Sequence, residues 1–277
     1  MSSVDRLILL AAGRGSRLVA GGEVPKPLVP VCGEPLIVRI LRAYADAGVR
    51  EAVVVVGFRG GDIRAALRGR RNLGLKVELA VNTAWERSNG LSVLAAAPFL
   101  DGPALLAMAD HLVTPDMVAK VAASRVRRDA LVLGVDRRIH ECFDIDDATK
   151  VKTDAAGRIV AIGKTLEDYD CIDTGVFRIS QTLVDALRGV VEARGDASLS
   201  QGVSALASRG LAFVQDVGDA FWLDVDTPEA WTEATRALVA RGDASTEIRM
   251  PGYVRAATGT GTTRAPIRDM PANDGRV

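Results

Sequence analysis

A few charged side chains in this sequence have the types and spacing to hold a polyphosphate and a divalent cation. Arg17 and Lys26 lie near the N-terminus, in a stretch rich in glycine and proline. Asp110 directly follows an apolar run, and Asp224 and Asp226 are two residues apart in an extended segment, so their side chains point the same way. Carboxylates are common ligands of Mg²⁺, and arginine and lysine bind phosphate oxygens. The pattern predicts Mg²⁺ on the three aspartates, with Arg17 and Lys26 on the phosphates.

The same carboxylates also have a structural interpretation. Thr114-Pro115 resembles a helix start, because threonine is favoured at the N-cap and proline at the first helical position. Asp110 could therefore cap that helix, and Asp226 or Thr227 could cap the helix expected at about 228–239. We favour the metal for Asp110, and Asp224 is the preferred ligand of the later pair.

The glycine-rich string begins directly after a short apolar run, residues 7–10. It reads Ala11-Ala12-Gly13-Arg14-Gly15-Ser16-Arg17-Leu18. Glycine lets the backbone turn sharply and bring its N–H groups close to phosphate oxygens. A dinucleotide fingerprint needs a third glycine where Leu18 stands, and the Walker A string does not occur in the sequence. We therefore expect a triphosphate-binding loop, with contacts from Ala11, Ala12, Gly13 and Gly15.

A polar, irregular stretch, residues 82–92, follows another apolar run. Amide and hydroxyl groups supply both donors and acceptors, which reading a base edge requires. We expect nucleotide contacts from Asn82, Asn89, Gly90 and Ser92. The alternative is an ordinary surface loop, because Asn-Gly also suits a tight turn.

Four more residues are candidates for contacting a second substrate. Lys150 and Lys164 could bind a phosphomonoester as point charges, and Asp173 could accept hydrogen bonds from hydroxyl groups. His111, next to Asp110, could also face the substrate. Solvated lysines and a histidine that only packs or caps are the alternatives.

The order of apolar runs and helical patterns predicts how these residues are positioned. Helices are expected at about 35–47, 57–67, 198–206 and 228–239. Strands are expected at about 7–10, 52–56, 76–81, 104–109, 131–135 and 212–217, with further short strands at 149–151, 158–162 and 171–179. This alternation predicts an α/β fold with a doubly wound, mostly parallel sheet and a small β-rich lobe over one edge. Ligands in such sheets bind at the carboxyl ends of the strands.

Composition excludes several classes of protein. Lys plus Arg and Asp plus Glu number 35 each among 277 residues, which argues against a nucleic-acid partner held by a basic surface. Three cysteines without paired spacing favour neither disulfides nor zinc. No apolar run is long enough to span a bilayer, so a cytoplasmic protein without membrane insertion is expected. From Asp243 to Val277 periodicity is lost, which predicts a mostly disordered tail after a catalytic domain at 1–240.

Three strings in order, L-A-A-G-x-G-x-R-L, P-K-P-L and G-E-P-L-I, resemble those of sugar-1-phosphate nucleotidyltransferases, as do Asp110 and Leu223-Asp224. The resemblance covers about residues 5–240. Four further strings are similar to those of CTP:inositol-1-phosphate cytidylyltransferases: Met108–His111, Ala148–Val151, Ile162–Lys164 and Ile172–Phe177.

The resemblance implies a Rossmann-like fold, Mg²⁺ as cofactor, and transfer from an NTP, here CTP, to inositol-1-phosphate. It implies that Gly13, Arg17 and Lys26 hold the triphosphate and that Asn82, Asn89, Gly90 and Ser92 flank the base. It also implies that Asp110 and Asp224 hold Mg²⁺ and that Lys150, Lys164 and Asp173 face the acceptor. Relatives are often fused to a membrane CDP-alcohol phosphotransferase, so a separate enzyme of that kind is an expected partner.

Other readings remain open at this point. Phosphocholine and phosphonate cytidylyltransferases and other sugar-1-phosphate nucleotidyltransferases are similar over the same core. A molybdopterin-type nucleotidyltransferase using GTP shares the loop and the Asp-x-Asp-Thr-Pro ending, but not the Thr-Lys-Val segment. A nucleotide-sensing module without chemistry is disfavoured, because the charged residues are intact.

Overall fold

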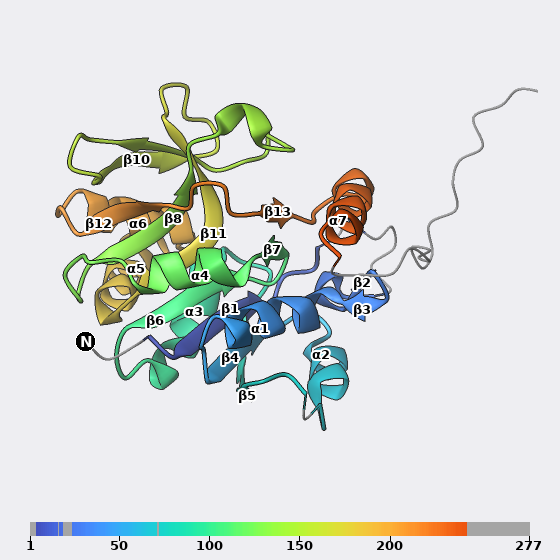
Figure 1. Ribbon diagram of the computed structural model, residues 1–277. Coiled ribbons are helices and arrows are strands. Elements are labelled where there is room, and N and C mark those ends of the chain that lie inside the picture. The colour runs from blue at the N-terminus through green and yellow to red at the C-terminus, as the bar shows by residue number, and fades with distance from the viewer. Residues whose placement is uncertain (1–3, 16, 19–23, 71, 243–277) are drawn as a thin grey trace, which may run out of the picture.

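A nine-stranded mixed sheet forms the centre of the computed structural model, which describes residues 4–15, 17–18, 24–70 and 72–242 (Figure 1). The predicted tail, residues 243–277, lies outside this part of the chain. The parallel half consists of β6 (Ala104–Met108), β1 (Arg6–Ala11), β4 (Glu51–Val56) and β5 (Lys76–Val81), in that spatial order. The predicted strands of this half are confirmed, and the apolar runs of β1, β4 and β6 are buried on both faces of the sheet, whereas β5 at the edge is partly exposed.

The other half of the sheet is built around one long strand, β11 (Cys171–Ile179), which runs antiparallel to β6. Strand β8 (Leu131–Asp136) pairs with the opposite edge of β11, and β9 (Lys150–Thr153) pairs with the first residues of β11 on the edge that further along carries β6. Outside them lie β12 (Ala212–Asp216), parallel to β8, and β10 (Ile159–Gly163), which forms a hairpin with β9. The hairpin expected as a lobe is thus hydrogen-bonded to β11 and continues one edge of the main sheet.

Helices cover both faces of the sheet, as expected for a doubly wound fold. Alternate residues of β1 point to opposite faces: Leu7 and Leu9 into one apolar core, Ile8 and Leu10 into the other. The first core is covered by α1 (Leu36–Asp46), α2 (Gly60–Leu67), α4 (Pro115–Ala122) and α7 (Pro228–Ala240). The second is covered by α3 (Gly90–Ala96), α5 (Gln181–Arg194) and α6 (Leu199–Ala207). Helix α5 was not among the predicted elements.

Several short elements complete the fold. Strand β7 (His111–Val113) pairs with β13 (Trp222–Asp224), and β2 (Pro30–Val31) pairs with β3 (Glu34–Pro35). Three single turns are η1 (Lys26–Leu28), η2 (Ala97–Phe99) and η3 (Ile139–Glu141). Because β13 pairs antiparallel with β7, Asp224 lies directly opposite His111.

The helix caps argue against the capping interpretation of Asp110 and Asp226. Thr114 is the N-cap residue of α4, and Thr227 is the N-cap of α7, where its hydroxyl accepts a hydrogen bond from the N–H of Ala230. Asp110 and Asp226 therefore cap neither helix, which leaves their carboxylates available to the site between the strands.

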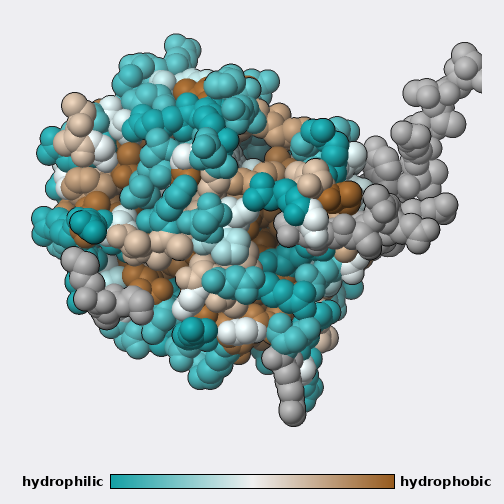
Figure 2. All heavy atoms as spheres, in the orientation of Figure 1, coloured by the Kyte–Doolittle hydropathy of each residue, from teal (hydrophilic) through white to brown (hydrophobic). Residues whose placement is uncertain are grey.

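Most of the face seen in Figure 2 is hydrophilic, with hydrophobic side chains in small separate areas. None of the helices in the described ranges is long and apolar enough to cross a membrane.

Helix α3 begins at Gly90, so the stretch expected to be irregular up to residue 92 ends in a helical turn. A Cβ at Gly90 would lie 2.4 Å from the carbonyl oxygen of Ala197 and 2.8 Å from Cδ2 of Leu187. We expect Gly90→Ala to lower the free energy of unfolding by about 2 kcal/mol, because backbone has to move to admit the methyl group.

The matched control is Gly189→Ala in α5, where a Cβ meets nothing within 4 Å. That change should stabilise the protein by up to about 1 kcal/mol through helix propensity. Urea unfolding of both variants measures the difference, and equal effects would contradict the packing argument.

Candidate active site

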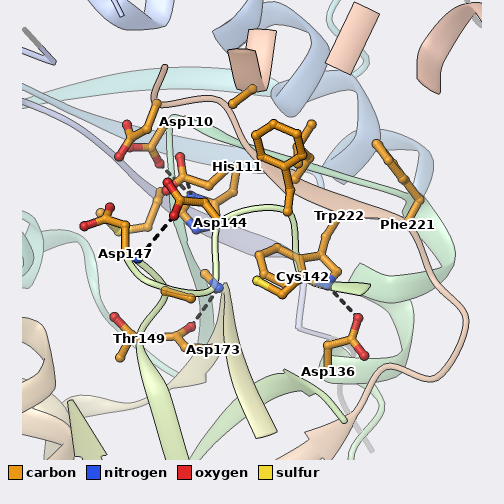
Figure 3. Close-up of a pocket in the computed structure, with 18 of the residues that line it drawn as sticks. Asp110, His111, Asp136, Cys142, Asp144, Asp147, Thr149, Asp173, Phe221 and Trp222 are labelled. Carbon is orange, nitrogen blue, oxygen red and sulfur yellow. Dashed lines mark hydrogen bonds and ion pairs between the residues drawn. The ribbon is translucent and has the colours of Figure 1, made fainter. Parts of the chain in front are cut away.

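A cavity of about 540 Å³ opens where β6 ends and β11 begins (Figure 3). Its walls come from Asp110 and His111 after β6, from Asp173 and Gly175 in β11, and from the segment around β13. The long connection from β8 to β9 forms a further wall. The cavity thus lies beside the carboxyl ends of the parallel strands, where the sequence places the glycine-rich loop.

Lys26 is the most deeply buried cation of the site, with 4% of its surface exposed. Its Nζ lies 2.8 Å from Oδ2 of Asp110 and 3.7 Å from Oδ1 of Asp224, and it is also paired with Asp226. Turn η1, with Pro27 in its first turn, positions Lys26. Gly15 has a φ of +62°, and a Cβ there would lie 2.4 Å from Cβ of Lys26. Glycine is needed at position 15 for the loop to approach this lysine.

The three predicted metal ligands lie together, and their chemistry fits a hard divalent cation. Oxygen Oδ1 of Asp224 is buried and has no hydrogen-bond partner. Ligand atoms of Asp110, His111 and Asp224 lie within 4.8 Å of one another, as do those of Asp147, Asp224 and Asp226. A buried anionic oxygen without a donor is stabilised by a cation. The carboxylates among these residues therefore fit Mg²⁺, while the assignment of each as a ligand stays a prediction.

The charges in this cluster reinforce one another. Burial would raise the pKa of Asp110, but Lys26 and His111 beside it hold that pKa well below its usual range. Burial would lower the pKa of His111, yet the charges of Asp224 and Asp110 raise it to about 9. Its Nδ1 lies 2.7 Å from Oδ1 of Asp110. At neutral pH the cluster therefore contains ionised Asp110 beside a protonated imidazole.

Arg17 also approaches the cluster. It is paired with Asp226, and its Nη1 donates to Oδ2 of Asp147 at 2.9 Å.

Ala11 and Ala12 are buried at the end of β1, so only their backbone could face a ligand. At Gly13 a Cβ would meet nothing within 4 Å, which leaves open space beside the loop.

The residues expected at the base make contacts within the protein. Asn82 is buried; its Nδ2 donates to Oγ of Ser92 at 3.0 Å, and its Oδ1 accepts from the N–H of Ala84 at 2.9 Å. Oδ1 of Asn89 accepts from the N–H of Leu199 at 2.8 Å, which ties this loop to α6. Of these residues Asn89 lines the cavity. Their contacts with a base stay predictions.

The acceptor-side residues divide into two groups. Lys164 lines the cavity and donates to Asp147 at 2.7 Å, whereas Nζ of Lys150 donates to the carbonyl oxygen of Lys164 at 3.0 Å and lies over the ring of Tyr169. Lys150 therefore supports Lys164 in the structure. Asp173 lines the cavity and accepts from the N–H of Gly175 at 2.7 Å.

The cavity residues that the sequence analysis did not single out include Asp136, Asp147 and Trp222. The indole N–H of Trp222 donates to Oδ2 of Asp136 at 2.8 Å, and its ring is nearly parallel to that of His111, with centroids 6.4 Å apart. Trp222 lies beside the Leu223-Asp224 string, which was a usable signal. Asp147 belongs to an acidic loop whose position only the tertiary structure reveals.

Comparison with known proteins decides the family. The MobA-like NTP transferase domain matches residues 7–170, more than half of the chain. The chain belongs to this family. Its predicted kinship with sugar-phosphate nucleotidyltransferases is thereby confirmed.

Individual members of the family are similar over most of the chain. This chain is 40% identical over 225 residues to the bifunctional IPC transferase and DIPP synthase of Rubrobacter xylanophilus. The aligned region covers 80% of this chain and 49% of that protein. The chain thus spans about half the length of such relatives. The solved structure of the inositol-1-phosphate CTP transferase from T. maritima matches with a TM-score of 0.73 and 27% identity, covering 86% of this chain and 97% of that one.

A shorter match is to the CMP-5'-(3-aminopropyl)phosphonate synthase of Streptomyces rubellomurinus, 38% identical over 121 residues, which are 43% of this chain and 19% of that protein.

Substitution of Lys26 tests whether the carboxylates form a cation site. Lys26→Met leaves Asp110, Asp224 and Asp226 facing one another without the ammonium group, so we expect unfolding free energy to fall by about 2 kcal/mol in EDTA. Mg²⁺ should then raise the melting temperature of the variant more than that of the wild type, because it replaces the missing charge.

Lys120→Met is the control, since Nζ of Lys120 donates to the carbonyl oxygen of Val217 outside this cluster. Thermal melts with EDTA or Mg²⁺ make the comparison. An equal response of both variants to Mg²⁺ would argue against a cation site.

Asp173 provides a pH-dependent test. Burial raises the pKa of Asp173 to about 6, so the folded protein binds this proton more tightly than the unfolded chain does. The contribution of Asp173 to stability therefore falls as pH rises from about 4 to about 6 and stays low above that range.

Asp173→Asn cannot ionise, and its Oδ1 can still accept from Gly175. We expect it to be more stable than the wild type by about 1 kcal/mol near pH 8 and equal to it near pH 4. Urea unfolding at both pH values measures this. A stability difference that is the same at both would show that Asp173 titrates normally.

Proposed function

We propose that the protein transfers a cytidylyl group from CTP to inositol-1-phosphate, giving CDP-inositol and pyrophosphate. The observation that carries the proposal is the cluster of buried Lys26 with Asp110, Asp224 and Asp226 beside the glycine-rich loop. The name of the T. maritima relative supports the choice of substrates, together with the strings that this chain shares with cytidylyltransferases.

In the proposed reaction a phosphate oxygen of inositol-1-phosphate attacks the α-phosphorus of CTP. A new P–O bond forms as the bond from the α-phosphorus to the bridging oxygen breaks, and pyrophosphate leaves with that electron pair. A phosphomonoester has a second pKa of about 6, so at neutral pH it is mostly dianionic and needs no general base. The main barrier is repulsion between anions and the charge on the leaving group.

The cationic side chains of the site address that barrier. Arg17 and Lys26 would neutralise the triphosphate, and Lys164 would hold the acceptor phosphate in line with it. Mg²⁺, when bound to Asp110 and Asp224 with Asp226 beside them, would offset charge on the phosphates and on the departing pyrophosphate. Asp173 would accept a hydrogen bond from a hydroxyl group of the acceptor.

A second acceptor class has specific support. Asp136, Glu141, Asp144 and Asp219 also line the cavity, and carboxylates suit an ammonium group as well as hydroxyl groups. The similarity to an aminopropylphosphonate enzyme points the same way. An amine-bearing phosphonate is therefore the alternative acceptor.

Pyrophosphate release in the presence of Mg²⁺ tests the proposal. ATP, CTP, GTP and UTP are each combined with inositol-1-phosphate, glucose-1-phosphate, phosphocholine or 2-aminoethylphosphonate. We expect turnover with CTP and inositol-1-phosphate. Turnover with CTP and the aminophosphonate alone would establish the alternative acceptor. The absence of pyrophosphate release with every combination would contradict both proposed acceptors.

Asp110→Asn should lower the rate of pyrophosphate release with the active pair of substrates at least about 100-fold, because a ligand of the cation is lost. Asp185→Asn is the control: Asp185 is an exposed residue of α5 that pairs with Arg188 at 3.4 Å, so activity should be unchanged. The product would be the substrate of a CDP-alcohol phosphotransferase, the partner that the sequence predicts.

A further inference from the structure

Asp147 connects two cations of the site. It lies in the loop between η3 and β9, lines the cavity, and has a side chain that is 32% exposed. Oδ2 accepts from Nη1 of Arg17 at 2.9 Å, and Oδ1 accepts from Nζ of Lys164 at 2.7 Å. One carboxylate thus binds both side chains at once.

The two cations come from separate parts of the fold. Arg17 follows the glycine-rich loop after β1, whereas Lys164 follows β10 in the antiparallel half of the sheet. Because they share Asp147, their nitrogen atoms are within reach of a single small anion. A phosphate group presents several acceptor oxygens and a negative charge of the same kind to such donors.

The loop around Asp147 has contacts that do not use its carboxylate. The N–H of Asp147 donates to Oδ1 of Asp144 at 3.3 Å, and the N–H of Ala148 donates to the carbonyl oxygen of Asp144 at 3.1 Å. The backbone is therefore held in place by Asp144. The Asp147 carboxylate remains for the cations.

We propose that Asp147 is a positioning residue that takes the place of a substrate phosphate in the nucleotide-free protein. It holds Arg17 and Lys164 together where the phosphates of the two substrates meet, and it competes with phosphate for both. Substrate binding displaces it, and its return favours departure of pyrophosphate. This inference rests on the proposed nucleotidyl transfer.

The test compares Asp147→Asn with Asp168→Asn. The first keeps an acceptor oxygen but removes the charge. The second removes the same charge from a side chain that is 83% exposed and pairs with Lys152 at 2.6 Å, in the same half of the sheet. Calorimetry measures inorganic pyrophosphate binding in EDTA and in Mg²⁺, and steady-state kinetics gives the product-inhibition constant of pyrophosphate.

We expect Asp147→Asn to bind pyrophosphate about five-fold more tightly in EDTA, the size expected for releasing two partly exposed ion pairs. Its product-inhibition constant should fall by the same factor, while Asp168→Asn matches the wild type. Melting temperatures establish that both variants fold.

Equal binding by Asp147→Asn and the wild type would overturn the inference and leave the proposed function intact. Weaker pyrophosphate binding by Asp147→Asn in both EDTA and Mg²⁺ would show that Asp147 orients a ligand. Weaker binding in Mg²⁺ alone would show that Asp147 is a ligand of the cation. Either result would overturn the inference. A wild type that neither binds nor releases pyrophosphate would overturn the proposed function as well.

Discussion

The site depends on one buried ammonium group, Lys26, held among carboxylates from distant parts of the chain. Asp110 is 84 positions further along the sequence, and Asp224 and Asp226 lie beyond the antiparallel half of the sheet. Removing such charges from water is unfavourable unless each finds a partner. The loop after β1, the end of β6 and the β7–β13 pair must therefore come together for the cluster to exist.

The fold meets this requirement through two kinds of strand pairing. Parallel pairing of β6 with β1 brings Asp110 to the same edge of the sheet as the glycine-rich loop. Antiparallel pairing of β13 with β7 then brings Asp224 opposite His111. A hydrogen bond from the N–H of Val225 to the carbonyl oxygen of Asp110 fixes the two segments together at 2.9 Å. Secondary structure alone thus determines most of the geometry of the cluster.

The sequence predicted the features that depend on local patterns. Apolar runs such as residues 52–56 identify buried strands, and Asp110 was recognisable because it follows one. The sequence could not reveal that β11 runs antiparallel at the centre of the sheet, because strand direction depends on partners far away along the chain. Asp147 was missed for the same reason: its partners, Arg17 and Lys164, are brought to it by tertiary structure. The sequence could not reveal that Asn82 bonds to Ser92 and Asn89 to Leu199, because these contacts depend on the tertiary structure, and their contacts with a base stay predictions.

In the proposed reaction, the two substrates would lie on different halves of the sheet. The residues predicted to contact the nucleotide follow the parallel strands β1 and β5, whereas Lys164 and Asp173 belong to the antiparallel half formed by β9, β10 and β11. Strand β10 is at the end of the sheet, and its hairpin is linked to the glycine-rich loop through Lys164, Asp147 and Arg17. Under the proposed function, changes in this hairpin that keep Lys164 would alter acceptor choice in evolution while the nucleotide chemistry stays the same.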